Sequence, residues 1–309
     1  YLKEMVEITM KKNHGLDLVV DAMINDSLAV YAAVAFVDKY SKIAIVLGTG
    51  FNMCCALKSD TFHNLKANFD APTVLVNLEL SLFGQQLLPD VTTRYDTSLD
   101  ARFIPKQALS FKSYLMKEHE RELICQPAEL LTSGRYLPEL VRLILLDLYE
   151  SHDIFQKVPL ESLDNLFIPY DGFLGEVTCF ISETQGNDRF NMIKAKLNDA
   201  YGWENVSDSD VELLLNAVHH VIERASYVAA CMLISTIKLM VKLNGMFTDP
   251  ILNIGYVGSV LTYFILYREL ILEYINKDEF ILKSGLTVGM KEITDSSIVG
   301  AAVGAAFYA

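Results

Sequence analysis

The chain has 309 residues, of which 51% are hydrophobic, and a formal net charge of −13. This composition excludes a disordered chain, and the charge argues against broad binding to nucleic acid or to an anionic membrane surface, since both need a basic footprint. The five cysteines are odd in number and show no C-x-x-C spacing, which favours free thiols over disulfides or a zinc site. We therefore expect a cytoplasmic protein with no metal site made of protein ligands.

The apolar segments raise the question of a membrane span. The longest, residues 225–237, ends at Lys238 and is shorter than the roughly 20 residues that a spanning helix needs. We expect it to be a buried helix. Residues 1–10 have apolar side chains at helical spacing, and the sequence opens on Tyr1 rather than Met. We interpret the sequence as part of a longer protein, so a signal peptide is neither seen nor excluded.

The first polar cluster in the chain is Asn25-Asp26-Ser27, which follows an apolar run at residues 18–24. We interpret that run as a buried strand that ends in an active site, because ligands of α/β proteins gather where strands end. The next run, residues 28–36, is rich in alanine and predicts a helix that Ser27 caps. The alternative interpretation is an Asn-Asp-Ser turn whose side chains satisfy only the local backbone.

A Gly-Thr-Gly sequence at residues 48–50 separates two predicted strands, residues 43–47 and 53–57. Glycines adopt positive φ and leave backbone N–H groups bare, so a tight hairpin here is able to receive an anion. The alternative is a plain hairpin turn that needs two glycines. A third predicted strand, residues 73–77, runs into Glu79, which places a second carboxylate just past a strand.

The rest of the chain alternates predicted helices and strands. Ser207 and the acidic residues after it predict a helix N-terminus before one or two long buried helices. The small-residue helix opened by residues 295–302 has a first turn suited to a phosphate or a nucleoside. In order, the expected elements are an irregular segment with a short polar helix (84–125), a helix (128–149, starting near 133–135), the long helices (211–241), a strand (251–255), a helix (261–275), a strand (286–290) and the last helix.

Taken together, these clusters resemble, in order, the motifs of the hexokinase family of sugar kinases, built on the actin-like ATPase (ribonuclease H-like) fold. Asn25-Asp26-Ser27 stands where the family has Asn-Asp-Thr, residues 48–52 where it has Gly-Thr-Gly-x-Asn, and residues 77–79 where it has Asn-x-Glu. Residues 126–129 resemble its Gln-x-x-Glu, and residues 133–143 resemble its Gly-Gly-Lys-Tyr-x-Gly-Glu-Leu-x-Arg-Leu helix. Three later segments match more loosely, namely residues 223–225, 257–259 and 295–302.

The resemblance implies an α/β fold with a mixed sheet and helices on both faces. It corresponds to the large domain of a two-domain sugar kinase with most of the small domain absent. On this basis residues 1–24 are the end of the small domain and residues 25–300 are the large domain. Residues 301–309 are then the start of a C-terminal helix that returns to the small domain.

The resemblance also implies an activity, the ATP-dependent phosphorylation of a hexose, with glucose expected, at its 6-hydroxyl. Asp26 would be the general base that takes the proton from that hydroxyl. The implied sugar ligands are Asn25, Asn52, Glu79, Gln126 and Glu129. The implied nucleotide residues are Thr49 and Gly50 at the phosphates, Arg135 in place of a lysine near them, and Ser259, Ser297 and Gly300 on the adenosine side. Mg²⁺ would arrive with ATP and stay mostly water-bound.

Departures from the family pattern leave two further hypotheses open. Glu223, Val257 and Ile298 replace a Thr, an Asp and a Gly on the expected nucleotide side, and they add charge or bulk there. They motivate a hexokinase-like sugar-binding regulator with little catalysis. Leu80 and Ser81 replace an aromatic residue and a Gly beside the sugar ligands, which motivates a kinase for an amino sugar such as N-acetylglucosamine.

Overall fold

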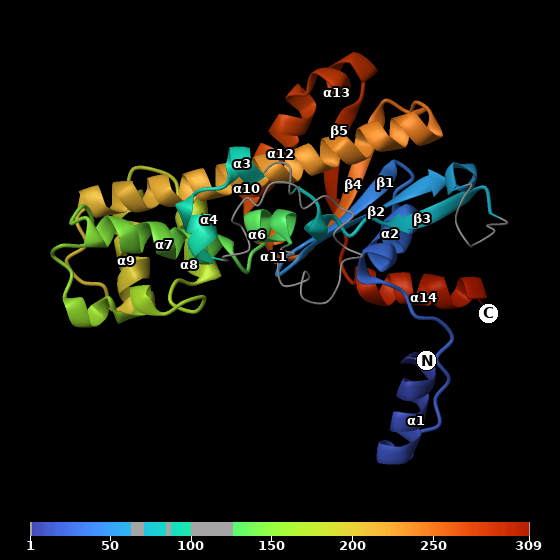
Figure 1. The fold of residues 1–309 in the computed structure, drawn as a ribbon, viewed down its shortest axis with the longest axis horizontal. Helices are drawn as coiled ribbons and strands as arrows, with labels where there is room; N and C mark the ends of the chain where they lie inside the picture. The colour runs from blue at the N-terminus through green and yellow to red at the C-terminus, as the bar shows by residue number, and fades with distance from the viewer. Residues whose placement is uncertain (1, 63–70, 85–87, 100–125, 309) are drawn as a thin grey trace.

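The computed structural model describes residues 2–62, 71–84, 88–99 and 126–308. A five-stranded sheet lies towards one end of the molecule and a group of helices towards the other (Figure 1). The strands are β1 Ser41–Leu47, β2 Phe51–Lys58, β3 Thr73–Asn77, β4 Ile251–Val257 and β5 Thr287–Glu292. All five were expected from the sequence, with small differences at their ends.

The helices account for most of the remaining described residues. Short 3-10 turns, η1 Ser59–Phe62, η2 Leu80–Leu82, η6 Leu160–Ser162 and η7 Asp164–Phe167, connect some of them. The helices are α1 Leu2–His14, α2 Asp26–Val37, α3 Leu88–Val91, α4 Arg94–Leu99, α6 Pro127–Thr132, α7 Leu137–Glu150, α8 Gly175–Glu183, α9 Arg189–Tyr201, α10 Asp208–Asn244, α11 Ser259–Tyr263, α12 Ile265–Lys277, α13 Glu279–Ser284 and α14 Ser296–Tyr308.

The sheet is mixed, with strand order β3-β2-β1-β4-β5. β1, β2 and β3 form antiparallel hairpins, whereas β1, β4 and β5 run parallel. The parallel neighbours β1 and β4 need a long connection between them. Its last part, the chain between β3 and β4, contains nearly all of the helical region. The tip of the β1–β2 hairpin and the end of β4 therefore lie at the same edge of the sheet, beside the helices.

Helices cover both faces of the sheet, as expected. On one face, α2 and α14 pack together beneath the strands (Figure 1). The side chains that meet α2 are small, Ala44 and Cys54 among them, and a Cβ on Gly255 would lie 2.5 Å from the Val34 side chain. On the other face, the larger side chains of β1 and β2 join the main core with α10, α6 and α7.

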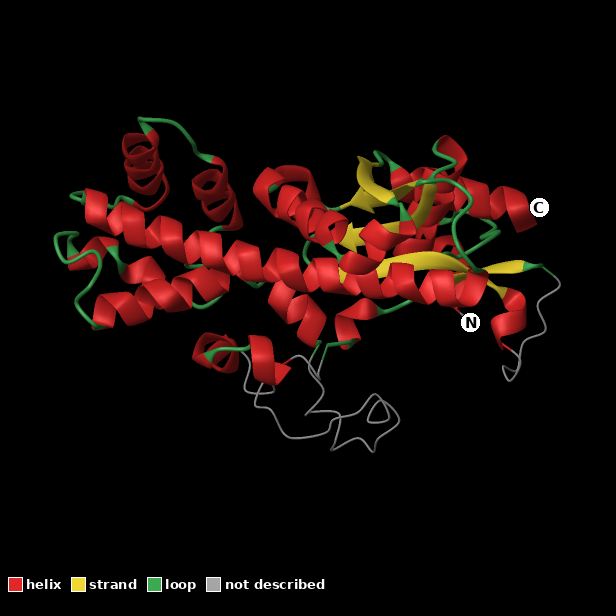
Figure 2. Ribbon diagram, turned by 90° about the horizontal axis from the view of Figure 1, so that it is seen from above, coloured by secondary structure: helices red, strands yellow, loops and turns green. Residues whose placement is uncertain are grey.

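Helix α10 is one continuous helix of 37 residues that crosses the length of the molecule (Figure 2). Ser207 caps it: its hydroxyl accepts from the Asp210 N–H at 3.2 Å, and the Asp210 carboxylate accepts from the Ser207 N–H at 2.8 Å. Of the helices in the described ranges, this one alone is long and apolar enough to cross a membrane. Half of its most apolar window is buried against the rest of the protein, as in a core helix.

Three local expectations differ from the structure. Residues 18–24 form a loop rather than a strand, and Val19 is 76% exposed; a strand needs a neighbour for its backbone hydrogen bonds, and this run pairs with none of the five strands of the sheet. Asn25, not Ser27, caps α2. The helix expected from residue 128 is divided into α6 and α7 by a turn at 133–136. Most of the expected irregular segment, and Cys125, lies outside the described residues.

Candidate active site

Two adjoining cavities lie at the edge of the sheet where the β1–β2 hairpin ends. The first has a volume of about 490 Å³ and the second about 600 Å³, and both are lined by Thr49 and Ser259. The first cavity is also lined by Asp26, Val46, Gly48, Gly50, Phe51, Asn52, Glu79, Ser81, Gln126, Glu129 and Gly258. It thus brings together Asp26 and four of the five expected sugar ligands, all but Asn25.

Asp26 is the first residue of α2, at the mouth of the first cavity. Its Oδ1 accepts from the Ser27 N–H at 2.7 Å. The Asn25 side chain accepts from the same N–H at 2.9 Å and from the Ser27 hydroxyl at 2.7 Å. A helix N-terminus favours negative charge, so the fold holds an exposed carboxylate here while Asn25 supports the turn beneath it.

Asn77, at the end of β3, connects the polar side chains of the first cavity. Its Oδ1 accepts from the Asn52 amide at 2.9 Å and from the Ser27 hydroxyl at 3.2 Å, and its own amide donates to Glu79 at 2.6 Å. Glu79 has a left-handed backbone with φ 47°, a conformation that costs energy and is often found at functional sites. Sequence reasoning missed Asn77 as a site residue, although the Asn-x-Glu spacing contained it.

Glu129 reaches the first cavity from α6. Its Oε2 accepts from the Phe51 N–H at 3.2 Å, and a Cβ on Gly50 would lie 2.9 Å from the same oxygen. Burial raises the pKa of the Glu129 carboxyl, and the negative charge of Glu79 raises it further, against the opposing effect of the Phe51 N–H. The glycine in the hairpin is therefore what allows this carboxylate to approach the loop so closely.

The Gly-Thr-Gly sequence forms the tight hairpin that was expected. The Gly48 N–H donates to the Gly50 carbonyl at 3.0 Å, and the Gly134 N–H donates to the Gly48 carbonyl at 2.7 Å. Gly258 has φ 117°, and a Cβ there would lie 2.4 Å from the Leu47 carbonyl oxygen. Three chain segments thus meet backbone to backbone, which leaves Thr49 exposed between the two cavities.

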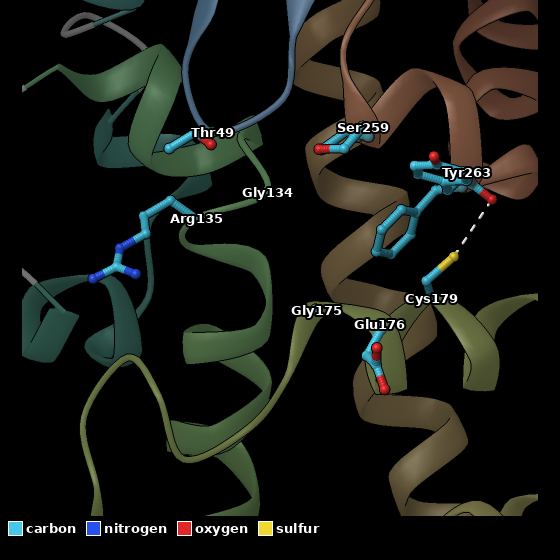
Figure 3. Close-up of a pocket in the computed structure, with 10 residues that line it drawn as sticks. Thr49, Gly134, Arg135, Gly175, Glu176, Cys179, Ser259 and Tyr263 are labelled. Carbon is cyan, nitrogen blue, oxygen red and sulfur yellow. Dashed lines mark hydrogen bonds between the residues drawn. The ribbon is translucent and has the colours of Figure 1, made fainter. Parts of the chain in front are cut away.

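The second cavity lies between the hairpin tip and α8 (Figure 3). Arg135 flanks one side, with its guanidinium 5.1 Å from the Tyr170 ring and 3.9 Å from the Asp171 carboxylate. On the other side the Cys179 thiol donates to the Tyr263 carbonyl at 3.4 Å, and burial raises the pKa of that thiol to about 11. The remaining lining residues are Gly134, Gly175, Glu176, Val260 and Phe264.

Comparison with known proteins decides the family. The hexokinase family model matches residues 42–307. The chain belongs to the hexokinase family. It is 46% identical to N-acetylglucosamine kinase 1 of Candida albicans over 99% of this chain and 60% of that protein. It is 25% identical to Hexokinase-9 of Oryza sativa over 96% of this chain and 54% of that protein.

The fold agrees with that of solved hexokinases. A hexokinase from Schistosoma mansoni in complex with glucose superposes with a TM-score of 0.77 at 21% identity, covering 98% of this chain and 61% of that one. The expected fold, a hexokinase large domain with a mixed sheet, is therefore confirmed. The chain spans about 60% of the length of the relatives that it matches most extensively.

Several residues singled out by the hexokinase motifs lie outside both cavities. A Cβ on Gly300 would lie 2.1 Å from the Ala29 carbonyl oxygen, so this glycine serves the close packing of α14 on α2. Ser297 and Ile298 are exposed on the same helix, and the Glu223 carboxylate lies 3.9 Å from His219 on α10. Nucleotide roles for Ser297 and Gly300 stay predictions, while Val257 adjoins Gly258 of the first cavity.

The second cavity contains most of the residues that sequence reasoning missed. Gly175, Glu176 and Cys179 come from α8, and Tyr263 and Phe264 come from the junction of α11 and α12. None of these residues belongs to a short motif, so only the folded chain brings them together. In the part of the chain that the structure describes, no three His, Cys, Asp or Glu side chains converge on one point that could hold a metal ion.

Proposed function

We propose that the protein containing this chain is an ATP-dependent sugar kinase whose preferred substrate is N-acetylglucosamine. The observation that carries the proposal is the 46% identity to an N-acetylglucosamine kinase over 99% of the chain, against 25% to a plant hexokinase over a similar span. The substrate named first by the sequence motifs, glucose, becomes the second candidate. Family membership and the carboxylate-rich first cavity suit both sugars.

In this proposal the first cavity binds the sugar and Asp26 acts as general base. The carboxylates of Glu79 and Glu129 accept from sugar hydroxyls, and the amides of Asn52 and Gln126 donate as well as accept. Asn77 fixes two of these side chains before the sugar arrives, and such positioning supplies much of the rate in phosphoryl transfer. Asp26 would then take the proton from the 6-hydroxyl as the hydroxyl oxygen bonds to the γ-phosphorus of ATP, while the bond from that phosphorus to the β,γ-bridging oxygen breaks and ADP leaves.

The second cavity suits the nucleoside triphosphate. The exposed hydroxyls of Thr49 and Ser259 and the Arg135 guanidinium supply donors and a positive charge for phosphate oxygens. Tyr263 and Phe264 offer apolar surface to the nucleoside. Mg²⁺ would enter with ATP, neutralise phosphate charge and keep mostly water ligands.

The hypothesis of an inactive regulator loses part of its motivation. It rested on Glu223, Val257 and Ile298, and none of these three lines either cavity, although Val257 adjoins Gly258 of the first. A site of action in the cytoplasm remains our proposal and rests on the use of cysteine. The four cysteines in the described ranges, Cys54, Cys55, Cys179 and Cys231, are all free thiols.

The test is an ADP-release assay on the full-length protein with N-acetylglucosamine, N-acetylgalactosamine, N-acetylmannosamine, glucose and mannose. We expect the highest kcat/KM with N-acetylglucosamine, and loss of activity on every sugar in the Asp26→Ala variant. A higher kcat/KM with glucose would move the assignment to a hexokinase. Sugar binding by calorimetry without ADP release would favour the regulator instead.

A further inference from the structure

Ser81 is a buried hydroxyl that no catalytic motif explains. It lies in η2, directly after Glu79 and Leu80, is 3% exposed and lines the first cavity. Its hydroxyl makes no hydrogen bond to any described residue. Only one unpartnered side-chain polar atom in the described ranges is sealed from solvent altogether, the hydroxyl of Ser133. The Ser81 hydroxyl is not among the sealed atoms, and Ser81 lines the first cavity.

This combination sets Ser81 apart from the other polar residues of the cavity. The Asn52 amide is engaged by Asn77, and Glu129 accepts from the Phe51 N–H. Thr49 and Gln126 are exposed and meet water. A nearly buried hydroxyl without a protein partner is costly unless water in the cavity or a bound molecule satisfies it. The cavity therefore presents one unused donor on its wall.

The position of Ser81 is fixed by the backbone around it. The Leu82 N–H donates to the Glu79 carbonyl at 3.2 Å and the Phe83 N–H donates to the Leu80 carbonyl at 3.0 Å. The Phe83 carbonyl accepts from the Ala128 N–H at 3.2 Å, which ties η2 to α6, the helix that carries Glu129. Ser81 thus lines the same cavity as two carboxylates, Glu79 and Glu129, and the charge of Glu79 raises the pKa of the Glu129 carboxyl.

The carboxylates of Glu79 and Glu129 and the hydroxyl of Ser81, which line the same cavity, have complementary hydrogen-bonding capacities. An ionised carboxylate only accepts, so Glu79 and Glu129 bind hydroxyl or N–H groups but repel a carbonyl oxygen. A serine hydroxyl donates to a carbonyl. The acetamido group of an N-acetylhexosamine presents both, an N–H donor and a carbonyl acceptor. The wall formed by Glu79, Ser81 and Glu129 matches that pair.

We propose that the Ser81 hydroxyl binds the carbonyl oxygen of the 2-acetamido group and so selects N-acetylhexosamines over simple hexoses. This inference rests on the proposed function and names the residue that sets its specificity. Glucose has no carbonyl at that carbon, and its hydroxyls already find partners in the carboxylates. Ser81 is therefore a specificity residue for one substituent, not a residue needed for phosphoryl transfer.

The test compares Ser81→Ala with the unaltered full-length protein on N-acetylglucosamine, glucose and 2-deoxyglucose. Loss of one neutral hydrogen bond should lower kcat/KM for N-acetylglucosamine by about 2- to 13-fold, whereas the values for the other two sugars should not change measurably. The matched control is Ser235→Ala on α10, an exposed serine outside both cavities. It should change none of the three.

Two further measurements separate the possible failures. Ser81→Cys keeps the shape with a weaker donor and should give an intermediate loss, and thermal unfolding shows that each variant is folded. Equal losses on all three sugars, or no loss on any, would overturn the inference and leave the proposed function standing. Calorimetry measures whether the unaltered protein binds N-acetylglucosamine, and ADP release measures whether it phosphorylates that sugar. If it does neither but phosphorylates glucose, both the Ser81 inference and the proposed function are overturned.

Discussion

The two cavities share a wall but are built in different ways. The first is lined by carboxylates and amides, two of which, Asn52 and Glu79, are hydrogen-bonded to Asn77 before any sugar arrives. The second is lined by glycine backbones, by a few exposed side chains and by aromatic residues from the α11–α12 junction. Arg135, the only arginine or lysine among the described residues that line it, is 48% exposed in its side chain and lies against Tyr170 and Asp171.

The difference matters for how each cavity responds to substitution. A network that depends on a single amide loses several contacts when that amide is removed, because the remaining partners are left unpaired. The second cavity is lined by backbone and by side chains that do not depend on one another, so a single substitution there removes one contact. We therefore expect large effects of single substitutions in the first cavity and smaller ones in the second.

The largest effect expected is that of Asp26→Asn. The amide cannot take the proton from the 6-hydroxyl, so kcat should fall by about 10²- to 10⁴-fold, the usual contribution of a positioned base. The KM for ATP should change little. Calorimetry should find the sugar still bound, and loss of sugar binding would show that Asp26 acts as a ligand rather than as a base.

Asn77→Ala tests the network of the first cavity. With the amide removed, Asn52 and Glu79 lose the partner that orients both, and we expect kcat/KM for the sugar to fall by about 10- to 100-fold, the cost of one or two hydrogen bonds to charged or neutral groups. The KM for ATP should stay within twofold, by the rough scale of a remote substitution. An equal rise in both KM values would contradict the separation of the two cavities.

Arg135→Ala tests the second cavity. The side chain is exposed and solvated, so the loss of its charge should raise the KM for ATP by only about 3- to 10-fold. Sugar affinity should not change. Arg135→Lys should recover part of the loss if charge is what matters, whereas no recovery would indicate that the guanidinium binds through its planar shape.

The smallest effect expected is on stability, from Glu129→Gln. Because burial and Glu79 raise the native pKa of this carboxyl above its value of 4.5, the folded protein binds the proton more tightly than the unfolded chain does. The raised pKa therefore stabilises the folded protein at pH values below the pKa of this carboxyl in the unfolded chain. That stabilisation is lost as the pH rises through the pKa of the carboxyl in the folded protein. Urea unfolding between about pH 4 and 7 should show this decline in the unaltered protein but a flatter profile in Glu129→Gln.

Prediction from sequence worked where the structure is decided locally. β1 and β2 were predicted because a short apolar strand on each side of a glycine turn has few alternatives. A Ser or Asp cap within residues 207–210 was predicted because a capping box is a contact within four residues, and the structure shows that Ser207 is the cap. The run at 18–24 was misread because a strand requires a neighbouring strand. Local pattern does not show whether a segment pairs with the sheet, and this one does not.

The same distinction separates the two cavities. Asp26, Asn52, Glu79 and Glu129 lie in short motifs whose order in the chain identified them. Cys179 and Tyr263 are 84 residues apart and carry no motif, so only the folding of α8 against the α11–α12 junction reveals them. Ser297 and Gly300 show the reverse case, since they stand in a motif yet the structure places them outside both cavities.

The length of helix α10 affects how the protein unfolds. At 1.5 Å per residue its 37 residues span about 55 Å, and it packs on β2 and α6 at the sheet and on α7, α8 and α9 in the helical group. Breaking it anywhere removes core contacts from both ends. We therefore expect the described part of the chain to melt in one cooperative transition, with protease cleavage within α10 rare until that transition begins.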